Sequence, residues 1–261
     1  ALLDLVGYDA EREELIFYVG EADYQAELNR RGFESSLEER QVGISATMIR
    51  ENPSCYWKYM AQPFRRHFTK KVLIMGSASN GKTTLAKDLA RYYDAPVSLE
   101  YAREYQIQNN VRDDELTPKD YYYLLLGQYA QTSRLIDSNA NRGLVVADTN
   151  SLVTKAYYDY YLKESPVQDE ETDTFDNLFA SILSKEKWDL ILFAEPVGAY
   201  VNDGFRDMSM ADEAIRSDFS SYLKRLKEEC LAHIPTVYLA GSYFDNYQAA
   251  KEAINKIYQA D

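Results

Sequence analysis

The sequence contains little cysteine and histidine, and each shortage excludes a class of protein. Only two of the 261 residues are cysteine, Cys55 and Cys230, and only two are histidine, His67 and His233. A disulfide-stapled fold is therefore excluded, and we expect a reducing, cytoplasmic compartment. A metal site built on histidine is not expected, because the two histidines lie far apart in the chain.

Long apolar runs and an excess of basic charge are also missing. The longest apolar runs, such as residues 72–75 and 124–126, are far too short to cross a bilayer, so we expect no membrane insertion. The 29 basic and 42 acidic residues give a net charge of −13, which argues against general binding to nucleic acid or to an anionic membrane. The hydrophobic share of 46% is that of an ordinary globular protein with one large or two small domains.

Short apolar segments alternate with helical patterns in most of the chain. We expect strands at 71–75, 97–99, 144–147, 190–193 and 236–239, and helices at 82–93, 121–140, 151–162, 175–185, 212–231 and 246–258. This alternation predicts an α/β fold with a parallel sheet flanked by helices on both faces. Upstream, residues 15–19 predict a buried strand and residues 22–31 a helix, while the acidic run at 169–173 is expected in a solvated loop.

One motif points to a nucleotide. It matches G-x-x-x-x-G-K-[ST] and consists of Gly76, Ser77, Ala78, Ser79, Asn80, Gly81, Lys82 and Thr83, followed by Thr84. Glycines let backbone N–H groups approach a triphosphate closely, and the N-terminus of the following helix favours an anion. We expect Lys82 to reach the β- and γ-phosphates of ATP and the Thr83 hydroxyl to hold Mg²⁺. The motif directly follows an apolar strand and opens a helix, which is the context that a working phosphate loop requires.

Three further features fit a phosphate-loop site, although each also has a purely structural interpretation. Asp148 ends an apolar strand and is expected to hold Mg²⁺ or its waters, unless the strand merely ends in a polar turn. Glu100 and Arg103 follow the second strand, where P-loop kinases place the phosphoryl acceptor. Glu100 could accept the hydroxyl proton and Arg103 could hold phosphates or a sugar, or both could belong to a solvated helix start. Arg206, beside a glycine, suits a lid that closes over phosphates, or an ordinary loop.

From Lys71 onwards the chain resembles the ribosylnicotinamide kinase domain of the NadR family. The likeness rests on the phosphate loop, on residues 100–104 (Glu-Tyr-Ala-Arg-Glu), on Asp148 and Thr149, on residues 203–206 (Asp-Gly-Phe-Arg) and on residues 242–247. Residues 44–50 resemble the I-S-x-T-x-I-R segment that closes a nicotinamide mononucleotide adenylyltransferase domain. The family fuses the two domains in this order.

The resemblance implies a division of the chain and a departure from the family. Residues 67–261 would be the P-loop kinase domain, and residues 1–66 the partial remnant of a Rossmann-like nucleotidylyltransferase domain with its linker. Ser45, Thr47 and Arg50 could retain a phosphate site there. The H-x-G-H-type motif of adenylyltransferases is absent from this sequence, so adenylylation is expected only of a longer parent protein.

The activity that the resemblance implies is ATP-dependent phosphorylation of the 5′-hydroxyl of nicotinamide riboside, with Mg²⁺ as cofactor. Catalytic roles would fall to Lys82, Glu100, Asp148 and Arg206, with either Glu100 or Asp148 as the base. The substrate would contact Glu100, Tyr101, Arg103 and Asp148, and the adenine would lie near Ser242 and Tyr243. Two alternatives stay open: another small-molecule or deoxynucleoside kinase, and an ATP-sensing regulator. The sequence also leaves open a homo-oligomer, and which of its 23 tyrosines touch the ring.

Overall fold

The computed structural model describes residues 15–38, 42–162 and 168–259, and its chain divides into two compact units, Ala1–Arg50 and Glu51–Asp261. In the first unit, β1 (Ile16–Val19) pairs in parallel with β2 (Glu34–Leu37), and α2 (Ala22–Arg30) connects them. The short helix α3 (Ala46–Glu51) follows. This βαβ arrangement agrees with the predicted strand and helix.

The prediction that residues 15–19 are buried is wrong. Tyr18 is 70% exposed and Ile16 is 40% exposed, whereas Phe17 is half-buried and packs edge-on against Phe33. The physical reason is that α2 contacts this two-stranded sheet on one face, so that only alternate side chains of β1 are covered. The apolar run is therefore a half-exposed strand.

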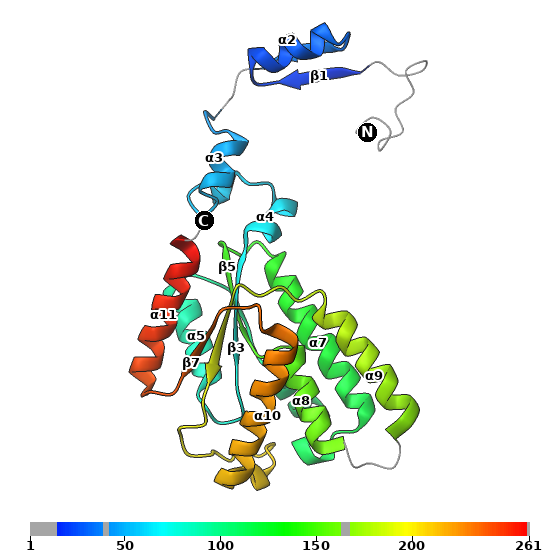
Figure 1. The fold of residues 1–261 in the computed structure, drawn as a ribbon, viewed down its shortest axis with the longest axis vertical. Coiled ribbons are helices and arrows are strands. Elements are labelled where there is room, and N and C mark those ends of the chain that lie inside the picture. The colour runs from blue at the N-terminus through cyan, green and yellow to red at the C-terminus, as the bar shows by residue number, and fades with distance from the viewer. Residues whose placement is uncertain (1–14, 39–41, 163–167, 260–261) are drawn as a thin grey trace. The chain divides into compact units, whose positions relative to one another are not determined.

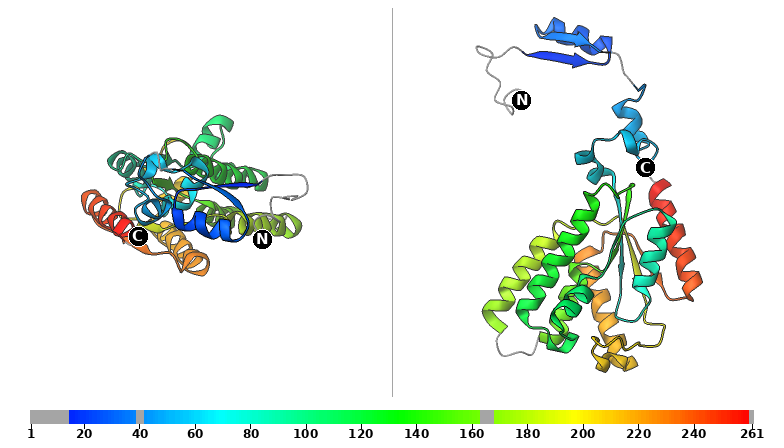
Figure 2. Two further views of the ribbon diagram at one scale, coloured as in Figure 1. Left: turned by 90° about the horizontal axis from the view of Figure 1, so that it is seen from above. Right: turned by 180° about the vertical axis from the view of Figure 1, so that it is seen from behind.

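The second unit is built on a five-stranded, fully parallel sheet with strand order β4-β5-β3-β6-β7. Figures 1 and 2 show the sheet between two layers of helices. The strands are β3 (Lys70–Met75), β4 (Val97–Ser98), β5 (Leu144–Asp148), β6 (Leu190–Ala194) and β7 (Thr236–Leu239). The predicted parallel sheet flanked by helices is thus confirmed.

Alternation along the central strand β3 decides which helices cover which face. Val72 and Ile74 pack with residues of α5 (Lys82–Tyr92) and α11 (Tyr243–Gln259). Leu73 and Met75 belong to the opposite core, which includes residues of α7 (Pro118–Ile136), α8 (Ser151–Leu162), α9 (Gln168–Leu183) and α10 (Glu213–Leu231). These four side chains, the last four of β3, are fully buried, and each stabilises the fold by about 1.5–3 kcal/mol.

The helix α9 also corrects the expectation for the acidic run at residues 169–173. These residues lie in the first turns of α9 and not in a loop. Acidic residues are favourable at a helix N-terminus because of the helix dipole, so a run of negative charge does not by itself exclude a helix. None of the helices in the described ranges is both long and apolar enough to cross a membrane.

The segment after Arg50 packs with the second unit, so the compact units divide earlier than the predicted boundary at 66/67. It contains a 3₁₀ turn (Trp57–Tyr59) and α4 (Gln62–Phe68). Trp57 is buried, and its indole N–H donates to the carbonyl of Asn141 at 2.9 Å. Asn141 in turn donates to Thr69 Oγ1 at 2.7 Å, at the entry to β3. The assignment of residues 1–66 to a nucleotidylyltransferase remnant stays a prediction.

Candidate functional site

The phosphate loop joins β3 to α5 at the carboxyl edge of the sheet, where parallel α/β sheets bind ligands. Gly76 has φ +143°, and a Cβ there would lie 2.3 Å from the carbonyl oxygen of Ala194. Gly81, immediately before α5, has φ +73°. Both positions therefore require glycine, one for close approach of the backbone and one for a left-handed turn. The backbone geometry therefore explains why the motif has glycine at these two positions.

Lys82 lies across the loop. Its side chain is almost completely buried, and Nζ donates to the carbonyl oxygen of Ser77 at 2.8 Å. Lys82 also lines the cavity in front of the loop. The ammonium group is thus held within the loop that the sequence predicts to receive phosphates.

Thr83 and Asp148 meet beneath the loop, as the sequence predicts for two residues of one metal site. Thr83 Oγ1 donates to Asp148 Oδ2 at 2.5 Å. Asp148 is fully buried, and its Oδ1 has no hydrogen-bond partner among the residues described. Burial raises the pKa of this carboxyl to about 6, even though the nearby Lys82 ammonium acts to lower it. A hydroxyl beside an under-coordinated carboxylate is the oxygen donor set that Mg²⁺ prefers, so these residues fit the cation.

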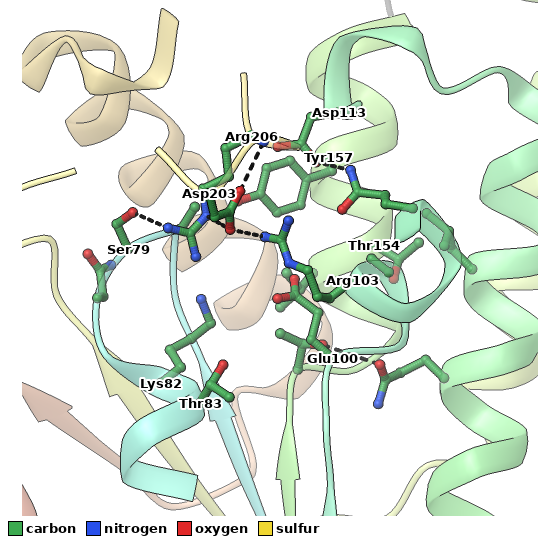
Figure 3. A pocket seen from close by; sticks show the side chains of 18 of the residues that line it. Ser79, Lys82, Thr83, Glu100, Arg103, Asp113, Thr154, Tyr157, Asp203 and Arg206 are labelled. Atoms are coloured by element: carbon green, nitrogen blue, oxygen red, sulfur yellow. Dashed lines mark hydrogen bonds and ion pairs between the residues drawn. The ribbon is translucent and has the colours of Figure 1, made fainter. Parts of the chain in front are cut away.

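The phosphate loop faces a cavity of about 450 Å³. Its other walls come from α6 (Tyr101–Asn109), α7, α8 and the loop at 201–206 (Figure 3). Three of the predicted site residues, Glu100, Arg103 and Arg206, line it together with Lys82 and Thr83. The structure therefore brings side chains from five separate segments of the sequence to one cavity.

Two carboxylates line the cavity opposite the phosphate loop. Glu100 stands at the N-terminus of α6 without capping it. Asp113 accepts from Gln106 Nε2 at 2.7 Å and from the backbone N–H of Asp207 at 3.2 Å. Burial raises the pKa of Asp113, although both hydrogen bonds act to lower it. This wall therefore carries two carboxylates beside Arg103 of α6, whereas Lys82 and Arg206 lie at the phosphate loop.

Tyrosine side chains also line this wall of the cavity, but Tyr101, which the sequence predicts to contact the substrate, is not one of them. Tyr121, Tyr157 and Tyr161 line the cavity, and the buried hydroxyl of Tyr121 has no hydrogen-bond partner in the described part of the chain. The ring of Tyr101 instead lies against Gly127 on α7, where an added Cβ would be 2.0 Å from it. The structure therefore does not place the Tyr101 ring where it would contact a ligand in this cavity.

Arg206 lies beside the phosphate loop, and its role as a lid residue stays a prediction. Its Nη1 donates to Ser79 Oγ at 2.7 Å and to the carbonyl oxygen of Val201 at 2.9 Å. Ser79 also accepts from the backbone N–H of Val201 at 3.0 Å. The loop that carries Arg206 is thus anchored to the phosphate loop through a single serine hydroxyl.

The remaining predicted residues lie elsewhere. Ser242 and Tyr243 follow β7 and do not line the cavity; Ser242 Oγ donates to Asp245, and the Tyr243 hydroxyl donates to Asp88 of α5. Their contact with adenine stays a prediction.

Among the residues described, the predicted phosphate site in the first unit contacts its near neighbours in the chain. Ser45 Oγ accepts from the N–H of Met48 at 3.1 Å and so caps α3, and Arg50 donates to Thr47 at 3.1 Å. Their role in binding phosphate stays a prediction.

Sequence reasoning missed several residues that line the cavity. Asp113 belongs to a short 3₁₀ turn without a motif, so nothing in the sequence marked it. Thr149 is buried with φ +73°, an unusual conformation for a residue other than glycine. Gln128, on α7, accepts from the backbone N–H of Tyr101 at 2.8 Å. The lone glycine inside α7, Gly127, was the available signal that a ring packs closely there.

Comparison with known proteins agrees with this geometry. A family model described as an AAA domain matches residues 71–245. The crystal structure of a NadR protein in complex with NR has a TM-score of 0.80 and 38% sequence identity, and the match covers 99% of this chain and 73% of that one. The chain belongs to the NadR family and carries an AAA domain. A second NadR structure, in complex with NAD and AMP-PNP, matches with a TM-score of 0.78 and 37% identity over 99% of this chain and 71% of that one.

Curated members of the NadR family are more distant and longer. The trifunctional NAD biosynthesis/regulator protein NadR of Escherichia coli (strain K12) is 28% identical over 222 residues, which are 83% of this chain and 50% of that protein. The chain therefore spans about half the length of this relative. A deoxyadenosine kinase from M. mycoides with bound dATP, 10% identical with a TM-score of 0.51 over 71% of this chain and 99% of that one, shares the P-loop kinase fold alone.

Proposed function

We propose that the second unit transfers the γ-phosphoryl group of ATP to the 5′-hydroxyl of nicotinamide riboside, releasing nicotinamide mononucleotide and ADP. One observation carries this proposal: the phosphate loop and a wall of carboxylate and tyrosine side chains share a single cavity. The loop suits the donor, and the opposite wall suits a polar acceptor. The NadR structures in complex with NR and with AMP-PNP support the same pair of ligands.

The acceptor side of the cavity favours a cationic ring. Glu100 and Asp113 supply negative charge, and Tyr157 supplies an aromatic face on the same side (Figure 3). The nicotinamide ring of the riboside carries a fixed positive charge, which carboxylates and the face of an aromatic ring both stabilise. Neutral nucleosides such as adenosine gain nothing from this charge.

Glu100 is the better candidate for the residue that accepts the hydroxyl proton. Its carboxylate lines the cavity, whereas Asp148 is fully buried and its Oδ2 already accepts from Thr83. Phosphoryl transfer proceeds through a loose transition state, so the proton leaves late and the base mainly orients the hydroxyl. Asp148 would then serve the metal and not the acceptor.

The other charged residues position and neutralise the phosphates. Thr83 and Asp148 would hold Mg²⁺, which would supply positive charge to the transferred phosphoryl group. Lys82 lies within the loop, and Arg206 reaches the loop from the opposite side at Ser79. The protein thereby offers two cations to the charge that builds up during transfer.

The proposal also covers the loop after β7 and residues 1–66. Ser242 and Tyr243 would contact the adenine from the loop after β7. Residues 1–66 would be the end of an adenylyltransferase domain, with Ser45, Thr47 and Arg50 as its residual phosphate contacts. Adenylylation and regulation, which the names of the curated relatives suggest, would belong to a longer protein.

Two competing functions can be distinguished by how the release of ADP depends on the acceptor. Another nucleoside kinase would use the same loop but would prefer a neutral nucleoside. An ATP-sensing regulator would hydrolyse ATP slowly whether or not an acceptor is present. Release of ADP is therefore measured with nicotinamide riboside, adenosine, deoxyadenosine and no acceptor, and we expect rapid release only with the riboside.

The Lys82→Ala variant links that activity to the loop. We expect it to abolish ADP release while the circular dichroism spectrum stays unchanged, because the loop loses the ammonium that neutralises the phosphates. Lys256→Ala, an exposed lysine on α11, is the matched control and should be as active as the wild type. Unchanged turnover in Lys82→Ala would contradict the mechanism, and faster turnover of a neutral nucleoside would contradict the substrate.

A further inference from the structure

The carboxylate of Asp203 lies between two arginines in the lining of the cavity. Asp203 Oδ2 is 2.8 Å from Arg103 Nη2 and 3.1 Å from Arg206 Nε. The three side chains are between 19% and 29% exposed, so the pairs are shielded from most of the solvent. Figure 3 shows Asp203 between the two guanidinium groups, with Lys82 pointing into the same space.

The two carboxylate oxygens of Asp203 have different partners. Oδ1 accepts from the backbone N–H groups of Phe205 and Arg206, both at 3.2 Å, and so shapes the turn that carries Arg206. Oδ2 makes both arginine pairs. An asparagine at this position could keep the turn through its carbonyl oxygen while it loses both ion pairs.

The two arginines differ in how firmly the backbone holds them. Arg103 belongs to helix α6, whereas Arg206 belongs to an irregular loop that also contacts the phosphate loop through Ser79. Arg103 Nη1 is buried and has no hydrogen-bond partner among the residues that the structure describes. Asp203 thus joins an arginine on a regular helix to an arginine on a loop, on the side of the cavity where phosphates would lie.

We propose that Asp203 is a positioning residue, which uses Arg103 on α6 as a fixed point and aligns the Arg206 guanidinium with the transferred phosphoryl group. This inference rests on the proposed kinase function. A carboxylate would repel a phosphate, so Asp203 does not contact the nucleotide and acts through Arg206. Small misplacements of a charged group lower the rate of transfer much more than they lower the affinity for the ground state.

The test is a comparison of Asp203→Asn with Asp212→Asn. Asp212 Oδ1 accepts from the N–H groups of Ala214 and Ile215 at the start of α10, so the control makes the same chemical change at a turn outside the cavity. We expect Asp203→Asn to lower kcat about tenfold, part of the roughly 1000-fold or greater effect of an arginine on phosphoryl transfer. The Kd for AMP-PNP, measured by calorimetry, should stay within about twofold or become tighter, because a negative charge has been removed. Asp212→Asn should change neither quantity.

A double-mutant cycle separates positioning from a structural role. In an Arg206→Ala background, Asp203→Asn should lower kcat no further, because its effect passes through the missing arginine. A further tenfold loss in that background, a tenfold weaker Kd for AMP-PNP, or an unchanged kcat in the single variant would each overturn the inference. A wild type that turns over only another nucleoside would overturn the proposed substrate instead, and the same cycle would then be run with that nucleoside.

Discussion

The buried carboxylate of Asp148 belongs to the proposed metal site, and its burial lowers the stability of the folded protein at neutral pH. Its pKa of about 6, compared with 3.8 for a free side chain, means that the ionised form is roughly 3 kcal/mol less stable in the protein than in water at pH 7. Asp148→Asn removes this charge and keeps the shape of the side chain. The carboxamide oxygen can still accept from Thr83, but its amide group faces the position where Oδ1 has no partner. An unpaired amide offsets about 1 kcal/mol, so we expect a net gain of about 2 kcal/mol.

The gain should depend on pH in a defined direction. Between about pH 4 and pH 6 the folded protein keeps a proton that the unfolded chain has lost, so the stability of the wild type falls as the pH rises. Urea unfolding at pH 7 should therefore show Asp148→Asn to be more stable than the wild type. Near pH 4, where the folded carboxyl is protonated and the unfolded one is only about half ionised, the cost of the buried charge falls to about 0.5 kcal/mol, so the difference should almost vanish.

Activity and stability should move in opposite directions in this variant. Without the carboxylate the proposed Mg²⁺ site loses a ligand, and we expect turnover to fall about 100-fold. Asp218→Asn, at an exposed position on α10, is the control and should change stability by less than about 0.5 kcal/mol at either pH. A lower stability of Asp148→Asn at pH 7 would show that the buried charge is compensated, and the reasoning from burial would then be wrong.

Three further substitutions test other parts of the structure. Glu100→Gln should lower kcat about 100-fold without weakening AMP-PNP binding, because it removes the proposed proton acceptor but no helix cap; equal losses of affinity and rate would argue for a binding role. Gly127→Ala should destabilise the protein by about 1–3 kcal/mol, because the new methyl group would meet the ring of Tyr101, and an unchanged midpoint in urea would refute that packing. Trp57→Ala should lower the free energy of unfolding by about 3–5 kcal/mol and Trp57→Phe by clearly less, whereas equal effects of the two variants would mean that the ring does not fill a buried space.

The sequence predicted the central part of the fold because its signals there are local. A glycine-rich turn between an apolar strand and a helix has one common structural solution, and the observed helix from Lys82 to Tyr92 closely matches the predicted one. Asp148 and Thr83 meet because parallel strands and the helix after the first of them converge on one edge. The parallel pairing of all five strands follows from the helices between them.

The parts that the sequence did not reveal depend on packing between distant segments. Tyr101 and Tyr157 are equally aromatic, so the sequence does not distinguish them. The ring of Tyr101 packs against Gly127 of α7, whereas Tyr157 on α8 lines the cavity. Asp113 reaches the cavity from a turn whose own residues carry no pattern. The half-exposed strand β1 was expected to be buried, because hydrophobicity alone does not reveal how many faces of a small sheet are covered.

The packing of Trp57 determines where the protein can be truncated. A fragment that began at residue 67 would preserve every residue of the phosphate loop and still remove the indole that rests against Gly143 and Asn141. Gly143 directly precedes β5, the strand that ends in Asp148. Anyone who trims the protein to its second unit should therefore cut at Glu51, because a cut at residue 67 would open the space that Trp57 fills beside the strand that carries the carboxylate of the proposed metal site.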